Sequence, residues 1–338
     1  MLGILPSLVT QRRQNIYDRK GVYMKKTKTA VKQKNLKKKI LARWQLYLLL
    51  GILVAYFLVF YYYPMFGIQL AFKKFNARDG IWGSDWIGLA NFKRFFSSYY
   101  FERTLTNTVR ISLYSLIAGF PLPVIFALVL NCMRNQKYKK FVQMVTYMPH
   151  FISTVLIVGM LNQFLNPVSG IYGVIYSFVT GDYSAAPDLL GKANAFPHLY
   201  VWSGVWQEIG WNSIIYIAAL AGVDAELHEA ATIDGATRFK RVLYIDIPCI
   251  VPTIVTLLIL RCGSVMSVGF EKAFLMQNNL NLVTSEVIST YAYKVSFNSG
   301  ISDFGLSTAI GLFNNVINLI MLLSVNYISK KVSENSLW

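Results

Sequence analysis

Charged residues are scarce in this sequence. Only 14% of the 338 residues are Asp, Glu, Lys or Arg, whereas 54% are hydrophobic. Soluble domains carry about a quarter charged residues, so this composition excludes an ordinary soluble domain and indicates a membrane protein. The net charge of +17 could suggest a nucleic-acid partner, but thirteen of the 33 basic residues precede Trp44. A basic arm before the first apolar run is typical of a cytoplasmic N-terminus beside anionic lipid, so no nucleic-acid partner is expected.

Cysteine and histidine are also rare, with three residues of each kind. The cysteines, at positions 132, 249 and 262, lie far apart without a CxxC spacing, so neither a disulfide framework nor a thiolate metal site is predicted. The histidines are isolated in the sequence, and we expect none of them to bind a metal. A GxxxxGK[S/T] phosphate-binding loop is absent, because Gly191-Lys192 lacks the upstream glycine and the following hydroxyl residue. We expect a chain that binds no cofactor and hydrolyses no ATP.

Six apolar runs reach the roughly twenty residues that a membrane span needs. The second run contains GFPLP at residues 119–123, which should kink its helix. The six predicted spans are Tyr47–Phe66, Ile111–Met133, Met144–Leu165, His198–Val223, Cys249–Phe270 and Leu306–Ile328. We therefore predict a basic, disordered N-terminal arm at residues 1–43, with either Met1 or Met24 as its start, and a six-span domain at residues 44–338.

Basic residues lie mostly on one side of this arrangement. With the N-terminus inside, 22 of them fall in the inner segments and ten in the outer segments. The outer loop from Ile68 to Arg110 fits this orientation least well, because it holds seven of the ten outer basic residues. The overall excess predicts that both termini are cytoplasmic.

The stretch EAATIDGATRFKRVLYIDIP, residues 229–248, is highly charged for a chain of this kind. Asp224 precedes a run of strong helix formers, Ala225 to Ile233, and can cap that helix. Asp234-Gly235 should end the helix, because glycine accepts a left-handed backbone. Thr237 can then cap a second short helix before the next span begins. The sequence predicts a helix, a glycine elbow and another helix at the cytoplasmic surface of the membrane.

The residue order of this insert resembles the EAA loop of ABC importer permeases. Its pattern is matched by Glu229-Ala230-Ala231, by Asp234-Gly235-Ala236 and by the ending Ile245-Asp246-Ile247-Pro248. Val242 stands where that family usually has Phe, which keeps the site apolar. Further stretches look like the sugar permeases of the carbohydrate-uptake group, especially the LplB-type polysaccharide permeases: YMPHFISTVLIVG at residues 147–159, WQEIGWNSIIYIAAL at 206–220, GFEKAFL at 269–275 and AIGLFNNVINLI at 309–320. The resemblance extends from about Trp44 to Trp338.

This resemblance implies an all-α membrane protein with six transmembrane helices of the type I importer permease (MetI-like) fold. The loop at residues 224–248 would be a coupling helix that docks in a cleft of a separate ATPase. The residues implied in that coupling are Glu229, Ala230, Ala231, Asp234, Gly235 and Ala236. Closure of the ATPase dimer on ATP would then push the insert and tilt the spans.

The resemblance also implies a function and a set of partners. The chain would be the non-catalytic permease subunit of an ATP-driven, binding-protein-dependent importer for oligosaccharides or polysaccharide fragments, working by alternating access. Its implied partners are a second homologous permease, two ATPase subunits that use ATP and Mg, and an extracytoplasmic binding protein. The expected location is the bacterial cell membrane, which the chain would cross several times.

Polar residues inside the predicted spans are candidates for a substrate path. A charge at membrane depth costs about 2.5–3.5 kcal/mol, so Glu208 and Arg261 should face a cavity or a partner. They would pair with each other or with a second subunit, or they would line the path, where the Arg261 fork suits a uronate carboxylate. Neighbouring amides and rings suit sugar hydroxyls and sugar faces, and the Asn cluster of the sixth span suits either packing or substrate. These further candidates are Gln207, Trp211, Asn212, Asn314, Asn315 and Asn318.

Two other functions share part of this pattern. A stand-alone secondary transporter would show inverted repeats with interrupted spans at matching positions, and the GFPLP break has no evident counterpart in the second half. An ABC permease for amino acids, peptides or another solute would share the EAA pattern. Only the resemblance to sugar permeases argues against that second alternative.

Overall fold

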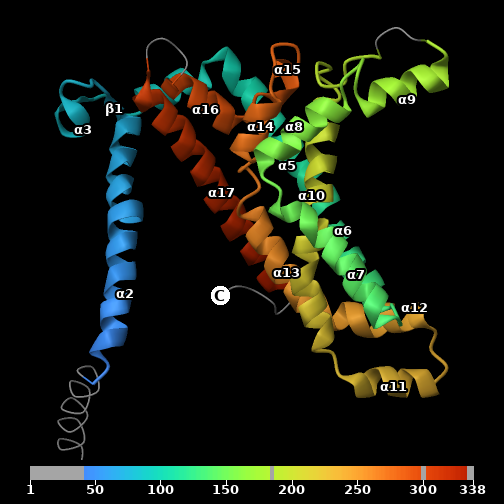
Figure 1. Ribbon diagram of the computed structural model, residues 1–338. Helices are drawn as coiled ribbons and strands as arrows, with labels where there is room; N and C mark the ends of the chain where they lie inside the picture. The colour runs from blue at the N-terminus through green and yellow to red at the C-terminus, as the bar shows by residue number, and fades with distance from the viewer. Residues whose placement is uncertain (1–41, 183–185, 298–301, 333–338) are drawn as a thin grey trace, which may run out of the picture. The chain divides into compact units, whose positions relative to one another are not determined.

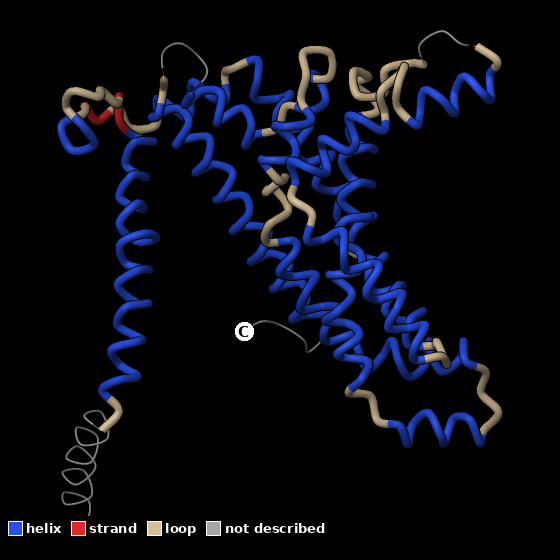
Figure 2. The backbone as a smooth tube through the Cα atoms, in the orientation of Figure 1, coloured by secondary structure: helices blue, strands red, loops and turns tan. Residues whose placement is uncertain are grey.

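The computed structural model describes residues 42–182, 186–297 and 302–332. The predicted basic arm at residues 1–43 lies almost wholly outside these ranges. The described chain is mainly helical (Figures 1 and 2). It divides into two compact units, residues 1–67 and residues 68–338, and each is described by itself.

The first unit consists of the first predicted span. Helix α2 (Trp44–Phe57) continues through the π-helical turn η1 (Leu58–Tyr62) into the 3-10 segment η2 (Tyr63–Phe72), whose end lies in the second unit. No charged residue occurs between Trp44 and Phe72, and these 29 residues are long and apolar enough to cross a membrane. The helix therefore agrees with the predicted span Tyr47–Phe66.

The second unit begins with a small ribbon that the all-α prediction missed. Strand β1 (Lys73–Lys74) pairs antiparallel with β2 (Asp85–Trp86), and Lys73 lies opposite Trp86. Lys73 Nζ donates to the carbonyl of Ile81 at 2.8 Å within the connection. The short helices α3 (Gly80–Gly83) and α4 (Ala90–Phe96) lie between and after the strands.

The second predicted span is longer than its apolar run. Helices α5 (Tyr99–Gly119) and α6 (Pro121–Asn131) together form a 33-residue span that begins before Ile111. Its early turns are polar but buried: Asn107 Nδ2 donates to the carbonyl of Val283 at 2.9 Å, and Thr108 Oγ1 accepts from the Ile288 amide at 3.0 Å. Because these partners come from the distant segment at residues 283–288, an apolar pattern could not indicate that the helix starts so early.

The third predicted span is not one continuous helix. Helix α7 (Gln136–Tyr147) leads through the 3-10 turn η3 (Met148–Phe151) to α8 (Thr154–Phe164), and the pair is bent by 98°. Pro149 lies in the turn, and Ser153 caps the new helix by accepting from the Leu156 amide. Helix α9 (Ile171–Thr180) follows and ends at the left-handed Gly181.

Helix α10 (Phe196–Ala221) packs along α5 and α6, and it leads into the insert at residues 224–248 (Figure 1). The insert contains α11 (Ala225–Ile233), α12 (Arg238–Arg241) and the π-helical turn η4 (Val242–Asp246), which runs directly into α13 (Ile247–Cys262). The predicted second short helix is thus the start of a continuous 25-residue span. That span ends at Cys262, not at Phe270 as predicted, because residues 263–269 are not helical.

The chain then turns through α14 (Phe270–Met276), α15 (Leu282–Ser285) and α16 (Ile288–Phe297) before the last span, α17 (Phe304–Val332). Within the described ranges, four helices are long and apolar enough to cross a membrane, or five if the bent α7–α8 pair counts as one span. Helix α10 has the length but carries Gln207, Glu208 and Asn212. The prediction of six spans is therefore confirmed only in part.

Candidate functional site

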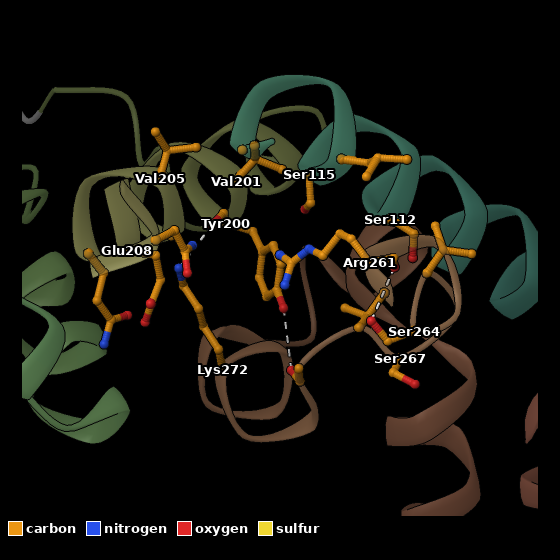
Figure 3. Close-up of a pocket in the computed structure, with 18 of the residues that line it drawn as sticks. Ser112, Ser115, Tyr200, Val201, Val205, Glu208, Arg261, Ser264, Ser267 and Lys272 are labelled. Carbon is orange, nitrogen blue, oxygen red and sulfur yellow. Dashed lines mark hydrogen bonds between the residues drawn. The ribbon is translucent and has the colours of Figure 1, made fainter. Parts of the chain in front are cut away.

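A cavity of about 480 Å³ lies where α5, α10, the end of α13 and α14 meet (Figure 3). A buried apolar cluster that includes residues of α5, α8, α10 and α14 adjoins it, because Tyr200, Val201 and Val268 belong both to the cluster and to the cavity wall. Hydroxyl, amide and charged groups form much of its wall, so the cavity suits a polar ligand with many hydrogen-bonding groups. The polar lining residues are Ser112, Ser115, Thr154, Tyr200, Gln207, Glu208, Asn212, Arg261, Ser264, Ser267, Glu271 and Lys272.

The non-helical segment at residues 263–269 forms part of the cavity wall. Asn318 of α17 anchors the segment: its Oδ1 accepts from the Met266 amide at 2.9 Å, and its Nδ2 donates to Ser267 Oγ at 3.0 Å. Gly263 packs against α17 so closely that an added Cβ would lie 2.7 Å from Leu322. Asn318 therefore holds the helix break in place and does not line the cavity.

Asn314 and Asn315 line a different hollow. They lie with Phe270, Ser289 and Tyr293 around a space of about 340 Å³ beside α16. The predicted Asn cluster is therefore divided between a structural anchor and a second hollow, and none of its three members lines the cavity beside α10.

Lys272 is the most deeply buried cation in the cavity wall, with 8% of its surface exposed. Its Nζ donates to the carbonyl of Tyr200 at 2.9 Å and lies 5.0 Å from the centre of the Tyr200 ring. Helix α14 is too short to span the membrane. Burial lowers the pKa of the Lys272 ammonium to about 8, and the nearby Glu208 carboxylate opposes that shift.

Arg261 lies in the last turn of α13, not halfway along a span as predicted. Its side chain lines the cavity and also an adjoining hollow of about 490 Å³ beside Trp211 and Tyr216. Of the alternatives considered for Arg261, the ion pair with Glu208 is not present, and Arg261 makes no ion pair within the part of the chain that the structure describes. A guanidinium is therefore present in the cavity wall without a carboxylate partner.

Glu208 instead contacts His150, which comes from the turn between α7 and α8. His150 Nδ1 lies 3.0 Å from Glu208 Oε2, and its ring stacks on Trp211 with the ring centres 4.2 Å apart and the planes at 4°. Gln207 Nε2 donates to the carbonyl of Ile152 at 3.1 Å. Gln207, Glu208 and Trp211, which we predicted to line the substrate path, thus hold the bend between α7 and α8 against α10.

The insert has the capping pattern that the sequence predicts. Asp224 accepts from the Glu226 amide at 3.0 Å, and Thr237 accepts from the Lys240 amide at 3.4 Å. Gly235 has a φ of +74°, the left-handed conformation expected for the elbow. Helix α11 spans Ala225–Ile233, the predicted range.

The predicted coupling residues lie on the surface of this insert. Glu229, Ala230, Asp234 and Gly235 are exposed, and Ala231 and Ala236 are partly buried. Two large apolar side chains beside them are also open to their surroundings, Ile233 at 87% and Phe239 at 75% exposure. Exposed apolar groups of this size next to small alanines form a surface suited to contact with another protein.

The comparison with protein families decides the identity of the chain. Residues 119–334 match the family described as binding-protein-dependent transport system inner membrane component. This chain belongs to that family. The permease is accordingly the membrane component of a transport system, a translocation subunit and not an enzyme, and the family predicted from the EAA pattern is confirmed.

Two similar proteins from Bacillus subtilis (strain 168) align with most of the permease. Protein LplB is 40% identical over 296 residues, which are 88% of this chain and 91% of that protein. The polygalacturonan/rhamnogalacturonan transport system permease protein YteP is 37% identical over 307 residues, which are 91% of this chain and 94% of that protein.

Two solved structures share the fold of the permease. One is a bacterial ABC transporter involved in the import of the acidic polysaccharide alginate; its chain is 37% identical with a TM-score of 0.80, over 88% of this chain and 99% of that one. The other is a bacterial alginate ABC transporter in complex with an alginate pentasaccharide-bound periplasmic protein, at 36% identity and the same TM-score, over 89% of this chain and 99% of that one.

Sequence reasoning missed eight of the twelve polar residues that line the cavity, Lys272 among them, and it missed His150, which contacts Glu208. Lys272 lies outside the predicted spans, so its charge was counted only in the outer loops. His150 was treated as isolated, although it directly follows Pro149, a break signal in an apolar run. A proline inside a predicted span could have indicated the bend and directed attention to the histidine beside it.

Proposed function

We propose that this permease is the transmembrane subunit of an ATP-driven, binding-protein-dependent importer of acidic oligosaccharides. The observation that carries the proposal is Arg261, a guanidinium in the wall of a polar cavity that has no carboxylate partner among the residues that the structure describes. Its planar fork suits a carboxylate of the sugar, and Lys272 adds a second positive charge in the same wall. Among its similar proteins, one is named for polygalacturonan and rhamnogalacturonan and another for import of the acidic polysaccharide alginate.

The negative groups of the cavity do not cancel this preference. Glu208 contacts His150 and lies near Lys272, so the charges of that side chain and of Lys272 partly offset each other. Glu271 also lines the cavity. Arg261 is therefore the group that we assign to recognition of an anionic sugar, while hydroxyls and amides such as Asn212 would bind the sugar hydroxyls.

A second part of the proposal concerns the partners. We infer that the permease pairs with a second homologous permease and with two ATPase subunits, and that it receives the sugar from an extracytoplasmic binding protein. The insert would dock on an ATPase through Glu229, Ala230, Ala231 and the exposed Ile233, with Gly235 setting its angle. In this assembly six spans cross the bacterial cell membrane, both termini are cytoplasmic, and alternating access moves the sugar.

Uptake by the complete transporter in proteoliposomes tests the substrate class. Oligogalacturonate and alginate oligosaccharides would be compared with neutral oligosaccharides of the same length, with the binding protein outside and ATP inside. We expect ATP-dependent uptake of an acidic oligosaccharide and much less uptake of its neutral counterpart. Equal transport of the two, or transport of neutral sugars alone, would refute the assignment of Arg261.

Cysteine labelling tests the orientation. An impermeant maleimide added to intact cells should label a cysteine introduced at Asp188 but not one introduced at Lys240, each in a background without the native cysteines. The opposite pattern would place the insert outside and exclude its contact with an ATPase. The stand-alone transporter is disfavoured by membership of a binding-protein-dependent family, and the Arg261 guanidinium in the cavity wall favours sugar acids over a neutral solute.

A further inference from the structure

Helix α11 is attached to the rest of the second unit in an unusual way. None of its nine residues is buried, so apolar packing contributes little to its position. Side chains one turn apart on one face make the contacts instead. His228 Nε2 lies 3.2 Å from Asp246 Oδ1, and Arg241 Nη1 donates to Thr232 Oγ1 at 2.9 Å. An i, i+4 pair on a helix shares a face, so His228 and Thr232 both face the helix that begins at α12.

Asp246 is the centre of this attachment. Only 2% of its surface is exposed, and it is the last residue of the π-helical turn before α13. Its Oδ1 also accepts from Asn131 Nδ2, the last residue of α6, at 3.5 Å. One carboxylate at the start of the fifth span therefore contacts both α11 and α6. A carboxylate withdrawn from water is stable only with such partners, which makes the position of His228 specific.

The helix that carries Asp246 also reaches the cavity. Arg238–Cys262 is a continuous run of helical turns, and Arg261 lies near its end in the cavity wall. At 1.5 Å per residue, Asp246 and Arg261 are separated by about 22 Å along this helix. If His228 displaced the Asp246 end of this helix, the Arg261 end would therefore move as well.

The exposed residues of α11 complete the geometry. Glu229 and Ala230 are exposed, whereas His228 is partly buried and faces Asp246. The docking residues Glu229 and Ala230 are thus sequence neighbours of His228 on other sides of one short helix, whereas Ala231, three residues after His228, lies on the same face as that histidine. The exposed residues Glu229 and Ala230 would contact the ATPase. The His228 side chain would transmit the movement of α11 to Asp246.

We propose that the His228–Asp246 contact is the strut that makes α11 and the fifth span move as one body, so that both are positioning residues for energy coupling. This inference rests on the coupling role proposed above for the insert. Without the His228–Asp246 contact, α11 would move with the ATPase on which it docks, but α13 would not move with α11. ATP would then be hydrolysed without a matching movement of the cavity wall.

The test is the number of sugars taken up per ATP hydrolysed, measured in proteoliposomes with the complete transporter. The variants are H228A, the conservative H228Q, and D246N, which keeps the shape of the carboxylate. We expect all three to assemble and to hydrolyse ATP in response to the sugar-loaded binding protein within about twofold of wild type. Uptake per ATP should fall about tenfold in H228A and D246N, the effect of losing one contact to a charged group, and less in H228Q.

A matched control and three outcomes decide the matter. E226Q changes an exposed charge on the same helix and should leave the ratio unchanged. A normal ratio in H228A and D246N would overturn the strut. Loss of assembly in all three variants, including H228Q, would assign the contact to folding and would also overturn it. The coupling role itself is tested separately by E229K: normal uptake in that variant would remove the proposed function of the insert, whatever the strut variants show.

Discussion

The insert and the cavity are built in opposite ways. The insert is one uninterrupted segment, residues 224–248, with its caps, its elbow and its exposed side chains set by near neighbours in sequence. The cavity is assembled from α5, α10, α13 and α14, and its lining extends from Ser112 to Lys272. The insert therefore depends on local conformation, whereas the cavity depends on how distant helices meet.

This difference affects how each region should respond to change. A backbone change in the insert should disturb its angle and leave the sugar preference intact. A side-chain change in the cavity should alter the preference and leave the insert intact. Variants in the insert should accordingly abolish uptake of every sugar, whereas variants in the cavity should abolish uptake of one class of sugar.

The largest effect is expected from Gly235→Pro in the elbow. Gly235 has a φ of +74°, and its amide donates to the Thr232 carbonyl at 3.1 Å. Proline fixes φ near −65° and has no amide proton, so it can provide neither feature. We expect a loss of uptake of about a hundredfold for acidic and neutral sugars alike, with normal amounts of protein in the membrane.

Gly235→Asn is the control for that prediction, because asparagine tolerates the left-handed region better than other residues with a side chain. It should retain most of the uptake. Comparable loss in Gly235→Asn would show that the position requires the absence of a side chain and not the backbone angle.

The next largest effect is expected from Arg261→Met in the cavity. Removal of an unpaired guanidinium leaves no buried carboxylate behind, so the variant should assemble normally. Uptake of acidic oligosaccharides should fall about tenfold or more, the value of one charge-assisted contact, while residual uptake of neutral sugars stays unchanged. Arg261→Lys should lose less, since it keeps the charge without the fork. Equal loss for both sugar classes would place Arg261 in the structure of the helix end and not in recognition.

Local signals in the sequence were sufficient for the insert. Asp224, Thr237 and Gly235 act within a few residues of their own positions, so the helix at residues 225–233 and its elbow could be predicted. The following helix could not be bounded in this way. It was expected to be a separate short helix before the next span, but a π-helical turn at residues 242–246 allows it to run on into the fifth span.

The cavity could be predicted only in part. Gln207, Glu208, Asn212 and Arg261 do line it, because polar groups in apolar runs favour a cavity. Their partners depend on tertiary structure: His150 reaches Glu208 only because the third span is bent by 98°. Trp211 lines the adjoining hollow instead. Asn318 anchors the break after Cys262, while Asn314 and Asn315 line the hollow beside α16.

A smaller effect is expected from pH, through Lys272. Burial lowers the pKa of this ammonium from 10.5 to about 8. The charged form therefore dominates below about pH 8 and is lost above it. Uptake of acidic oligosaccharides should decline severalfold between pH 7 and pH 9, as the attraction in the cavity wall weakens. In Lys272→Met the uptake should be lower at pH 7 but should lack this decline. A decline of equal size in the variant would assign it to another subunit.

The smallest effect is expected from the cap of α11. Asp224 accepts from the Glu226 amide, and removal of such a cap costs about 1 kcal/mol of helix stability. Since α11 has no buried residue, little packing compensates for that loss. Asp224→Ala should therefore raise amide hydrogen exchange in residues 225–233 about fivefold in the permease alone, the factor that 1 kcal/mol gives. Asp224→Ser retains a capping oxygen and should exchange like wild type.

Exchange in the cavity-lining turns of α10 should be the same in all three proteins, because the local stability of the insert is separate from the packing of the spans. Faster exchange in both regions would mean that the two regions open together, and the contrast between a locally determined insert and a packed cavity would then be wrong.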